Sequence, residues 1–362
     1  MRRLSLSVAV LALSLASVGG VSQQAAAAPL PAGYQAAAGG DLATIDLDDF
    51  TTGPNLSAAR LAATDAKMNG GGNPFTSASS TATASNLGAA LTALSIAVQS
   101  NTQTAPPDHT APTAGPLVGA TSPGLFDLSP LNSSIQARTE AAVACTPNGG
   151  MIANAQLSTG GAILSPTGIG TVVDTGNSTT AGEVSIVPEP TGDPFNRAVL
   201  SKAAGTISNN LFLDGSVRVA VVGESTLRAV ATGEPGGADV SYTAGTVTVD
   251  ADTLGPSAPA TLAPGQSVSY TTSVGRVVVT VNQPTVTESA DGRTATGRVA
   301  VVTVDIIVGP VATPLATAKV DLLPLRASAT APNGGIDCAP PAPVLTAPTD
   351  GSTLTDTTPT FT

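Results

Sequence analysis

Short apolar segments separated by turn residues run along most of the chain. Val217–Val222 and Val274–Val281 are β-branched runs, which favour strands over helices. Pro284–Glu288 and Thr294–Val308 flank an Ala-Asp-Gly sequence, which predicts a hairpin with its glycine at positive φ. We therefore expect an all-β fold over 41–338, a large antiparallel sandwich or barrel-like domain with long Pro- and Gly-rich loops.

Three segments have patterns that need separate interpretation. In Val240–Val249 the parity of the apolar positions changes near Ala244 and Gly245, which fits a β-bulge or two strands joined by a tight turn equally well. Leu87–Val98 has helical spacing and also alternates as a strand would. The Pro-rich segment Gln103–Gly124 is expected to be a loop.

The N-terminus has the pattern of a secretory signal. Arg2 and Arg3 precede the apolar run Leu4–Val18, and small residues follow up to a cleavage point placed after Ala27. A retained membrane anchor needs ~20 apolar residues, and this run is shorter and interrupted by serine. The sequence therefore predicts a signal peptide over 1–27 and a secreted chain without a membrane span.

The predicted secretion determines how the two cysteines are interpreted. Cys145 and Cys338 each lie beside a Pro-Asn-Gly-Gly sequence, and an oxidising compartment favours one disulfide between them. The alternative is two unpaired thiols. A cysteine-based metal site is not expected, because the chain has one histidine and no CxxC motif.

Composition suggests further boundaries. Residues 28–40 are rich in Ala and Gly, which predicts a disordered leader. Residues 339–343 form a stiff Pro-rich linker. Over 344–362 the order strand, Asp-Gly turn, strand resembles the start of a bacterial immunoglobulin-like repeat. That resemblance implies a truncated β-sandwich, since a complete one needs ~100 residues, and we expect the sequence to be a fragment.

Charge and composition exclude one class of function. The chain has 14 basic and 25 acidic residues and a net charge of −11, so it offers no basic stripe for nucleic acid. Hydrophobic residues make up 42% but aromatic residues only 2%, which predicts a core of small aliphatic side chains.

Candidate chemistry is sparse. His109 is the only imidazole and lies in a Pro-rich stretch, so we interpret it as an exposed loop residue rather than a general base. Alternate carboxylates in a strand share a face, so Asp46 with Asp48, or Asp250 with Asp252, either bind Ca²⁺ or are solvated charges.

Glycosidase chemistry would need paired carboxylates. Glu183, Glu189, Glu224 and Glu288 are the available glutamates, but the chain has no Trp and few Tyr for sugar-stacking surfaces. We predict no catalytic residue, no cofactor and no metal ligand.

Four segments carry a family resemblance: Thr104–Thr110, Gly233–Thr243, Ala295–Arg298 and Ala329–Cys338. With them the middle of the chain resembles secreted actinobacterial surface proteins of the choice-of-anchor kind, including ones anchored through an LAETG-type sorting signal. The resemblance implies a β-rich exported region and carries over no catalytic residue.

These observations predict a non-catalytic exported protein of the cell surface or cell wall, with a structural or adhesive role. Its partners would be cell-wall or extracellular surface components. The alternative is an accessory region, carbohydrate-binding or scaffolding, of an exported hydrolase whose catalytic part lies beyond the C-terminus.

Overall fold

The computed structural model describes residues 33–49, 55–70, 79–88, 98–138, 149–190, 196–251 and 259–337. All of them belong to Pro31–Thr362, the second of two compact units. Every regular element in this described part is a β-strand, and its strand pairings are antiparallel. The all-β expectation is confirmed. Within the same residues, no helix is long and apolar enough to cross a membrane.

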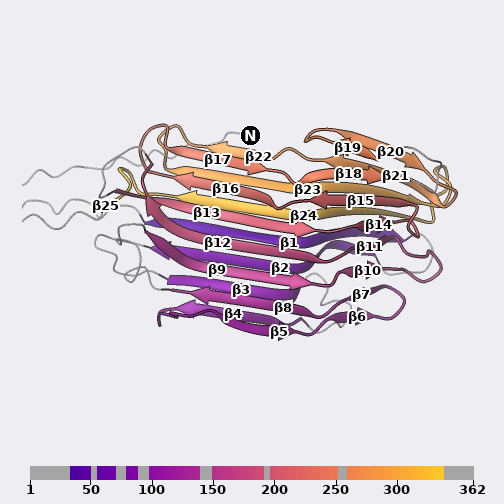
Figure 1. Cartoon of the computed structure of the whole chain (residues 1–362), viewed down its shortest axis with the longest axis horizontal. Coiled ribbons are helices and arrows are strands. Elements are labelled where there is room, and N and C mark those ends of the chain that lie inside the picture. Colours follow the sequence, from indigo (N-terminus) through magenta and orange to yellow (C-terminus); the bar gives the residue numbers. More distant parts are fainter. Residues whose placement is uncertain are drawn as a thin grey trace, which may run out of the picture. The chain divides into compact units, whose positions relative to one another are not determined.

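Sheet A forms one layer. Its strands run in the order β20 (Ser267–Thr271), β21 (Gly275–Val281), β23 (Thr294–Val308), β24 (Ala316–Thr330), β1 (Tyr34–Asp49), β2 (Leu56–Gly70), β3 (Ser79–Leu87) and β4 (Ser100–Ala105), with β22 (Thr285–Glu288) paired to β23. The first strand, β1, pairs with the late strand β24 in the middle of this sheet (Figure 1).

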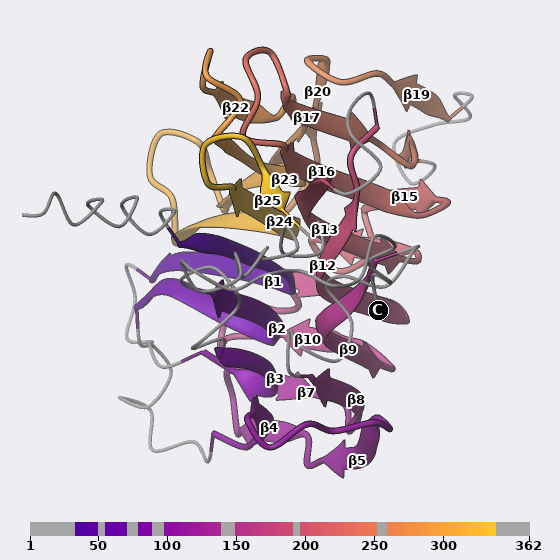
Figure 2. The ribbon, with the colours of Figure 1, turned by 90° about the vertical axis from the view of Figure 1, so that its left-hand side faces the viewer.

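Sheets B and C form the second layer. Sheet B runs in the order β17 (Ala238–Thr243), β16 (Ser225–Ala231), β13 (Asn196–Ile207), β12 (Ser178–Pro188), β9 (Gly150–Thr159), β8 (Leu131–Ala137) and β5 (Thr113–Leu117), with β25 (Ile336–Asp337) paired to β13. Sheet C runs in the order β19 (Ala260–Leu262), β18 (Thr246–Asp250), β15 (Val217–Val222), β14 (Asn210–Phe212), β11 (Val173–Asp174), β10 (Ala162–Leu164), β7 (Phe126–Leu128) and β6 (Ala120–Ser122). Consecutive strands such as β13 and β14 belong to different sheets, so the chain crosses from sheet B to sheet C between them. Figure 2 shows this second layer facing β1, β2 and β3 of sheet A.

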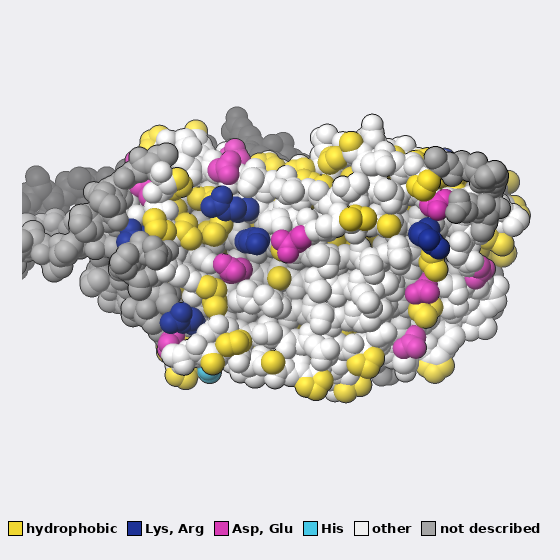
Figure 3. Space-filling view, in the orientation of Figure 1, with side chains coloured by type: hydrophobic (Ala, Val, Ile, Leu, Met, Phe, Trp, Pro, Cys, Tyr) yellow, Lys and Arg dark blue, Asp and Glu magenta, His cyan; other side chains and the backbone are white. Residues whose placement is uncertain are grey.

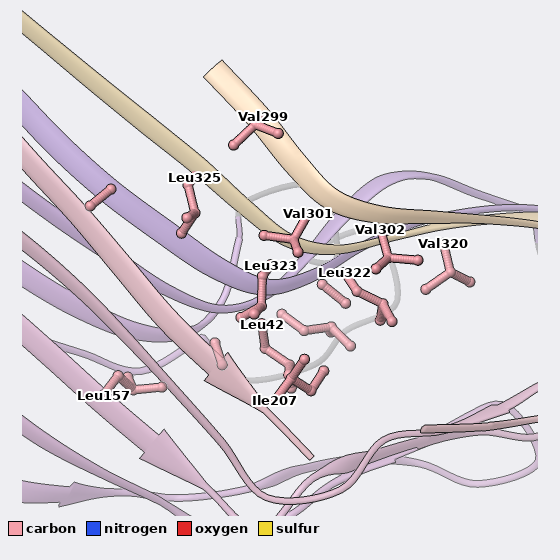
Figure 4. Close-up of a cluster of buried hydrophobic side chains, with 14 of the residues drawn as sticks. Leu42, Leu157, Ile207, Val299, Val301, Val302, Val320, Leu322, Leu323 and Leu325 are labelled. Atoms are coloured by element: carbon pink, nitrogen blue, oxygen red, sulfur yellow. The ribbon is translucent and has the colours of Figure 1, made fainter. Parts of the chain in front are cut away.

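Sheet A is kinked across four adjacent strands. Strands alternate inward and outward side chains, but β1, β2, β23 and β24 each contain two successive residues whose side chains are both in the core. On β23 and β24 these two are the only successive buried residues, and on β1 and β2 they lie within the longer buried runs 38–43 and 61–64. The pairs are Leu42 with Ala43, Leu61 with Ala62, Val301 with Val302, and Leu322 with Leu323. Ala62 and Leu323 take positive φ there, and Figure 4 shows the core side chains gathered around this row. The kink lies where the opposite layer changes from sheet B to sheet C.

Sheets A and B approach closely because the residues between them are small. A Cβ on Gly182 of β12 would lie 2.8 Å from the carbonyl carbon of Ala38 on β1. The Ser201 hydroxyl of β13 donates to the Ala37 carbonyl at 2.7 Å, which joins the layers directly. Most buried hydrophobic residues are Ala, Val or Leu, which confirms the predicted small-residue core.

Two sequence expectations were wrong in part. The leader predicted to be disordered through residue 40 already belongs to β1 from Tyr34. Its Ala and Gly residues are ordered because they lie where the two layers are close. The predicted loop Gln103–Gly124 contains the end of β4 and all of β5 and β6. Pro116 fits in β5 because β5 is an edge strand of sheet B, where a missing N–H is tolerated.

The predicted hairpin is confirmed, since β22 pairs with β23 and Gly292 between them has φ of 71°. At Ala244 and Gly245 the alternative of two strands is confirmed and that of a β-bulge is wrong, because the chain has only these two residues between β17 and β18. It leaves β17 in sheet B and enters β18 in sheet C, which keeps both halves against the core. The ambiguous segment 87–98 lies largely outside the described residues, as do the signal peptide 1–27, the linker 339–343 and the segment 344–362.

Candidate functional site

A groove of about 680 Å³ lies on the outer face of sheet A, at the kink. The kink creates it, because two successive inward residues on each strand leave a row of the outer face without side chains. On β1 the bare row lies between Asp41 and Thr44, and on β23 between Ala300 and Thr303. The charged residues that line the groove are Asp41, Arg60, Arg298, Lys319, Asp321 and Arg326.

Asp41 is the centre of a charge cluster that spans β24, β1 and β2. Its side chain is 3% exposed. Arg60 donates to it from Nε at 2.9 Å and from Nη2 at 2.7 Å, and Arg326 donates from Nη1 at 3.2 Å. Arg326 also bonds Asp65 at 2.8 Å, so two arginines and two aspartates balance each other. The hydrogen bond to Asp41 raises the pKa of Arg60 above its ordinary value, against the lowering effect of burial.

Gly39 makes this cluster possible. In the strand register it lies between Arg326 on β24 and Asp65 on β2, so the guanidinium passes over it to reach the carboxylate. A Cβ at Gly39 would overlap the Thr64 carbonyl oxygen and lie 3.1 Å from both Arg326 Nη2 and Asp65 Oδ1. Gly39, which lies in the segment predicted to be a disordered leader, is therefore required because the Arg326 guanidinium and the Thr64 carbonyl come so close to it.

A second polar row borders the other side of the groove. The Thr303 hydroxyl donates to Asp321 at 2.6 Å, and Lys319 lies 3.8 Å from the same carboxylate. The Asn282 amide nitrogen donates to the Ala300 carbonyl and to the Thr303 hydroxyl, both at 2.8 Å. These bonds fix the Asn282 side chain and leave its amide oxygen as an acceptor.

Arg298 is the lining cation without a counter-charge among the described residues. It lies on β23 directly opposite Arg326 of β24 and opposite Thr285 of β22. Like charges opposite each other on neighbouring strands repel, and Arg326 leans away toward Asp41 and Asp65. Arg298 is exposed, so its five N–H donors face the groove and solvent.

The outer face of sheet B has a different character. Asn132, Ser158, Thr179 and Thr206 stand in register across four strands, and we call this row the hydroxyl ladder. The Thr179 and Thr206 hydroxyls are 2.7 Å apart. Figure 3 views this side of the molecule and shows mainly uncharged polar surface with scattered charges.

Of the residues predicted for a disulfide or for calcium, three lie in the part of the chain that the structure describes: Asp46, Asp48 and Asp250. Cys145, Cys338 and Asp252 lie outside the described residues. Asp46 and Asp48 share the outer face of β1, where Asp46 accepts the Ala58 N–H at 2.6 Å. No group of three or more metal-ligating side chains occurs in the part of the chain that the structure describes.

The candidate acid and base residues are spread over separate elements. His109 is in the loop between β4 and β5, and its Nε2 lies 3.1 Å from the Thr104 carbonyl oxygen. Glu183 lies on β12 of sheet B and Glu288 on β22 of sheet A, where Glu288 accepts the Val240 N–H. Glu189 and Glu224 follow β12 and precede β16, respectively.

Sequence reasoning missed the groove and its charge cluster. Arg326 and Asp41 are 285 residues apart in the chain, and only the pairing of β1 with β24 joins them. A signal existed in each strand separately, because Asp41, Arg60, Arg298 and Arg326 are isolated charges within otherwise apolar or small-residue runs.

No protein-family model, curated protein or solved structure matches the chain significantly.

Proposed function

We propose that this chain is an exported protein of the cell surface or cell wall that acts by binding, with the sheet A groove as its contact site. The observation that carries this proposal is the cluster around Asp41. Three guanidinium N–H groups already occupy the oxygens of this buried carboxylate, which suits a fixed recognition surface better than proton transfer.

Rigid strands hold the groove in place. Arg60, Arg326 and Asn282 are each fixed by two or more hydrogen bonds to neighbouring strands, so little conformational entropy remains to be lost on binding. The hydroxyl ladder on the opposite face supports the same proposal, because hydroxyl and amide groups keep an exported domain hydrated while adding little charge.

Within this proposal, adhesion is favoured over a load-bearing stalk. Tyr34 begins β1 at the same end of sheet A at which Thr330 ends β24, and the two strands are paired antiparallel. A load between the two ends of the described chain would separate β1 from β24 one hydrogen-bonded pair at a time, which resists force poorly. A domain tethered at one end and loaded through its face avoids this geometry. Pulling on residues 33 and 337 by single-molecule force spectroscopy should therefore give a lower unfolding force than pulling on 33 and 316.

The function itself is tested with the exported full-length protein. We expect it to sediment with insoluble cell walls and to be released by a wall-digesting enzyme. Recovery of the protein in the medium with and without that enzyme would contradict a wall or surface association. Turnover of a wall polymer by the purified chain would contradict a binding role.

A further inference from the structure

We infer that the groove binds an oxyanion, a carboxylate or phosphodiester group of a polyhydroxylated polymer, through Arg298. This inference rests on the proposed function and names the chemistry that its contact site recognises. The reasons are the charge balance of the groove, the donors beside Arg298 and the contrast with the one comparable pair of cations on sheet B.

The charge balance of the groove leaves Arg298 in excess. Arg60 and Arg326 are neutralised by Asp41 and Asp65, and Lys319 is close to Asp321. On the neighbouring strands β22 and β24, the residues directly opposite Arg298 are not acidic, and neither are the strand residues two positions before or after them. An anion between Arg298 and Arg326 would remove the repulsion between two directly opposed arginines.

The donors around Arg298 suit an oxyanion. A guanidinium presents a planar fork that matches a carboxylate or phosphate with two parallel hydrogen bonds. Arg326 uses three bonds for Asp41, Thr64 and Asp65, which leaves two of its five N–H groups for a ligand. Thr285 on β22 lines the same groove and offers a hydroxyl.

The remaining lining groups favour a ligand that also carries hydroxyls. Asn282 donates twice to the protein, so its amide oxygen is an acceptor for a ligand O–H. The Gln283 side chain is exposed at the rim and can both donate and accept. A simple inorganic anion would use Arg298 and leave these groups to solvent water, whereas a hydroxyl-bearing ligand would bond to both.

A second pair of cations, on sheet B, is the other place where an anion could bind. Lys202 and Arg228 also stand directly opposite each other on β13 and β16. Glu183 lies opposite Lys202 on its other side, so an acidic partner is present in that row. The open groove on sheet A has no such acid beside Arg298. The net charge of −11 repels anions from the molecule as a whole, so specific binding requires a local arrangement of this kind.

The test measures the affinity of the full-length exported protein for three polymers. Polygalacturonate supplies carboxylates, poly(glycerol phosphate) supplies phosphodiesters, and dextran is the neutral control. We expect binding to one or both anionic polymers and none to dextran, and the polymer that binds more tightly identifies the source of the oxyanion. We also expect the binding to weaken as salt is added.

Matched variants locate the site. Arg298→Gln should weaken binding about tenfold, because it removes a charge-assisted bidentate contact. Arg298→Lys should weaken it less, since the charge remains while the fork is lost. Arg228→Gln removes the same charge from the opposite face and should change binding less than about twofold. Arg298 has no bonded partner to lose among the described residues, so its variants should unfold at the wild-type temperature or above it.

Several outcomes would overturn the inference. These are equal binding of dextran, unchanged binding by Arg298→Gln, or an equal loss in Arg228→Gln. If neither anionic polymer binds although the protein sediments with cell walls, the proposed function survives and this inference fails. If the polymers bind but the protein does not associate with walls, the binding site survives and the proposed location fails.

Discussion

The two outer faces of the sandwich cover similar β-layers with different chemistry. On sheet A, charges are concentrated at the kink and bonded to one another around Asp41. On sheet B, the hydroxyl ladder spreads uncharged polar groups over four strands. This difference indicates that the position of the groove is determined by the kink rather than by the composition of the strands. It bares a row of backbone on one face, and long charged side chains reach across that row.

The largest expected difference between the faces comes from Asp41. Asp41→Asn would leave two guanidinium groups without their shared carboxylate, although both arginine side chains are about one-third exposed. Removing one partner of a buried ion pair costs 3–5 kcal/mol, and solvent around the arginines reduces this to about 2–3 kcal/mol. Urea unfolding measures the loss.

Asp48→Asn is the matched control, because it makes the same chemical change at an exposed position of the same strand. It should alter stability by less than about 0.5 kcal/mol. Equal losses in the two variants would show that the Asp41 cluster contributes nothing special to sheet A.

A smaller loss is expected at Gly39, where the cluster crosses β1. Gly39→Ala would force a methyl group against the Thr64 carbonyl oxygen and disturb the bond from Arg326 to Asp65. We expect a cost of about 1–3 kcal/mol from this overpacking, measured by thermal unfolding. Gly160→Ala, directly after β9 of sheet B, is the control, since its new methyl would meet Ser129 at an ordinary 3.4 Å. A neutral Gly39→Ala would mean that the strand can shift without breaking the cluster.

The dependence of stability on alkaline pH tests the packing at the edge where β17 of sheet B borders β22 and β23 of sheet A. Burial raises the pKa of Tyr242 on β17 to about 12, from an ordinary value near 10. Above pH 10 the unfolded state loses this proton while the folded state keeps it, so stability falls as pH rises from 10 to 12. Because the ring is partly exposed, we expect a loss of about 1 kcal/mol.

Tyr242→Phe should remove that part of the alkaline loss and should be tolerated at pH 7, because the buried hydroxyl has no hydrogen-bond partner among the described residues. Urea unfolding of both proteins at pH 7, 10 and 11.5 makes the comparison. A wild-type and a Tyr242→Phe protein with identical alkaline losses would show that this tyrosine is not protected by folding.

The smallest effect is expected on the hydroxyl ladder. Thr179→Val keeps the β-branched shape and removes only an exposed hydroxyl that lies 2.7 Å from Thr206. We expect a change within about 0.5 kcal/mol in thermal unfolding and no change in polymer binding. A marked loss of binding would move the functional face from sheet A to sheet B.

Much of the fold could be predicted from local sequence. The hairpin of β22 and β23 followed from its Ala-Asp-Gly turn, and the β-branched run Val274–Val281 contains β21. Predictions failed where tertiary context overrides composition. Tyr34 begins a strand within an Ala- and Gly-rich stretch because the opposing layer needs small residues there, and Pro116 lies in a strand because that strand is at an edge.

The candidate site could not be predicted in the same way. Asp41 was visible only as one carboxylate, and its partners Arg60 and Arg326 come from other strands. Their meeting depends on the pairing of β1 with β24 and on the kink, both of which are long-range properties. The chemistry that local spacing did suggest, the Asp46 and Asp48 pair, remained two exposed carboxylates on the outer face of one strand.

The central claim, that the molecule binds through the Arg298 side of sheet A, is tested most directly by arginine modification with phenylglyoxal, mapped by mass spectrometry. In the free protein we expect Arg298 and Arg228 to react readily, and Arg60 and Arg326 to react slowly because Asp41 holds them. With the bound anionic polymer present, Arg298 should be protected while Arg228 reacts as before. Protection of Arg228 with Arg298 left reactive would contradict the account.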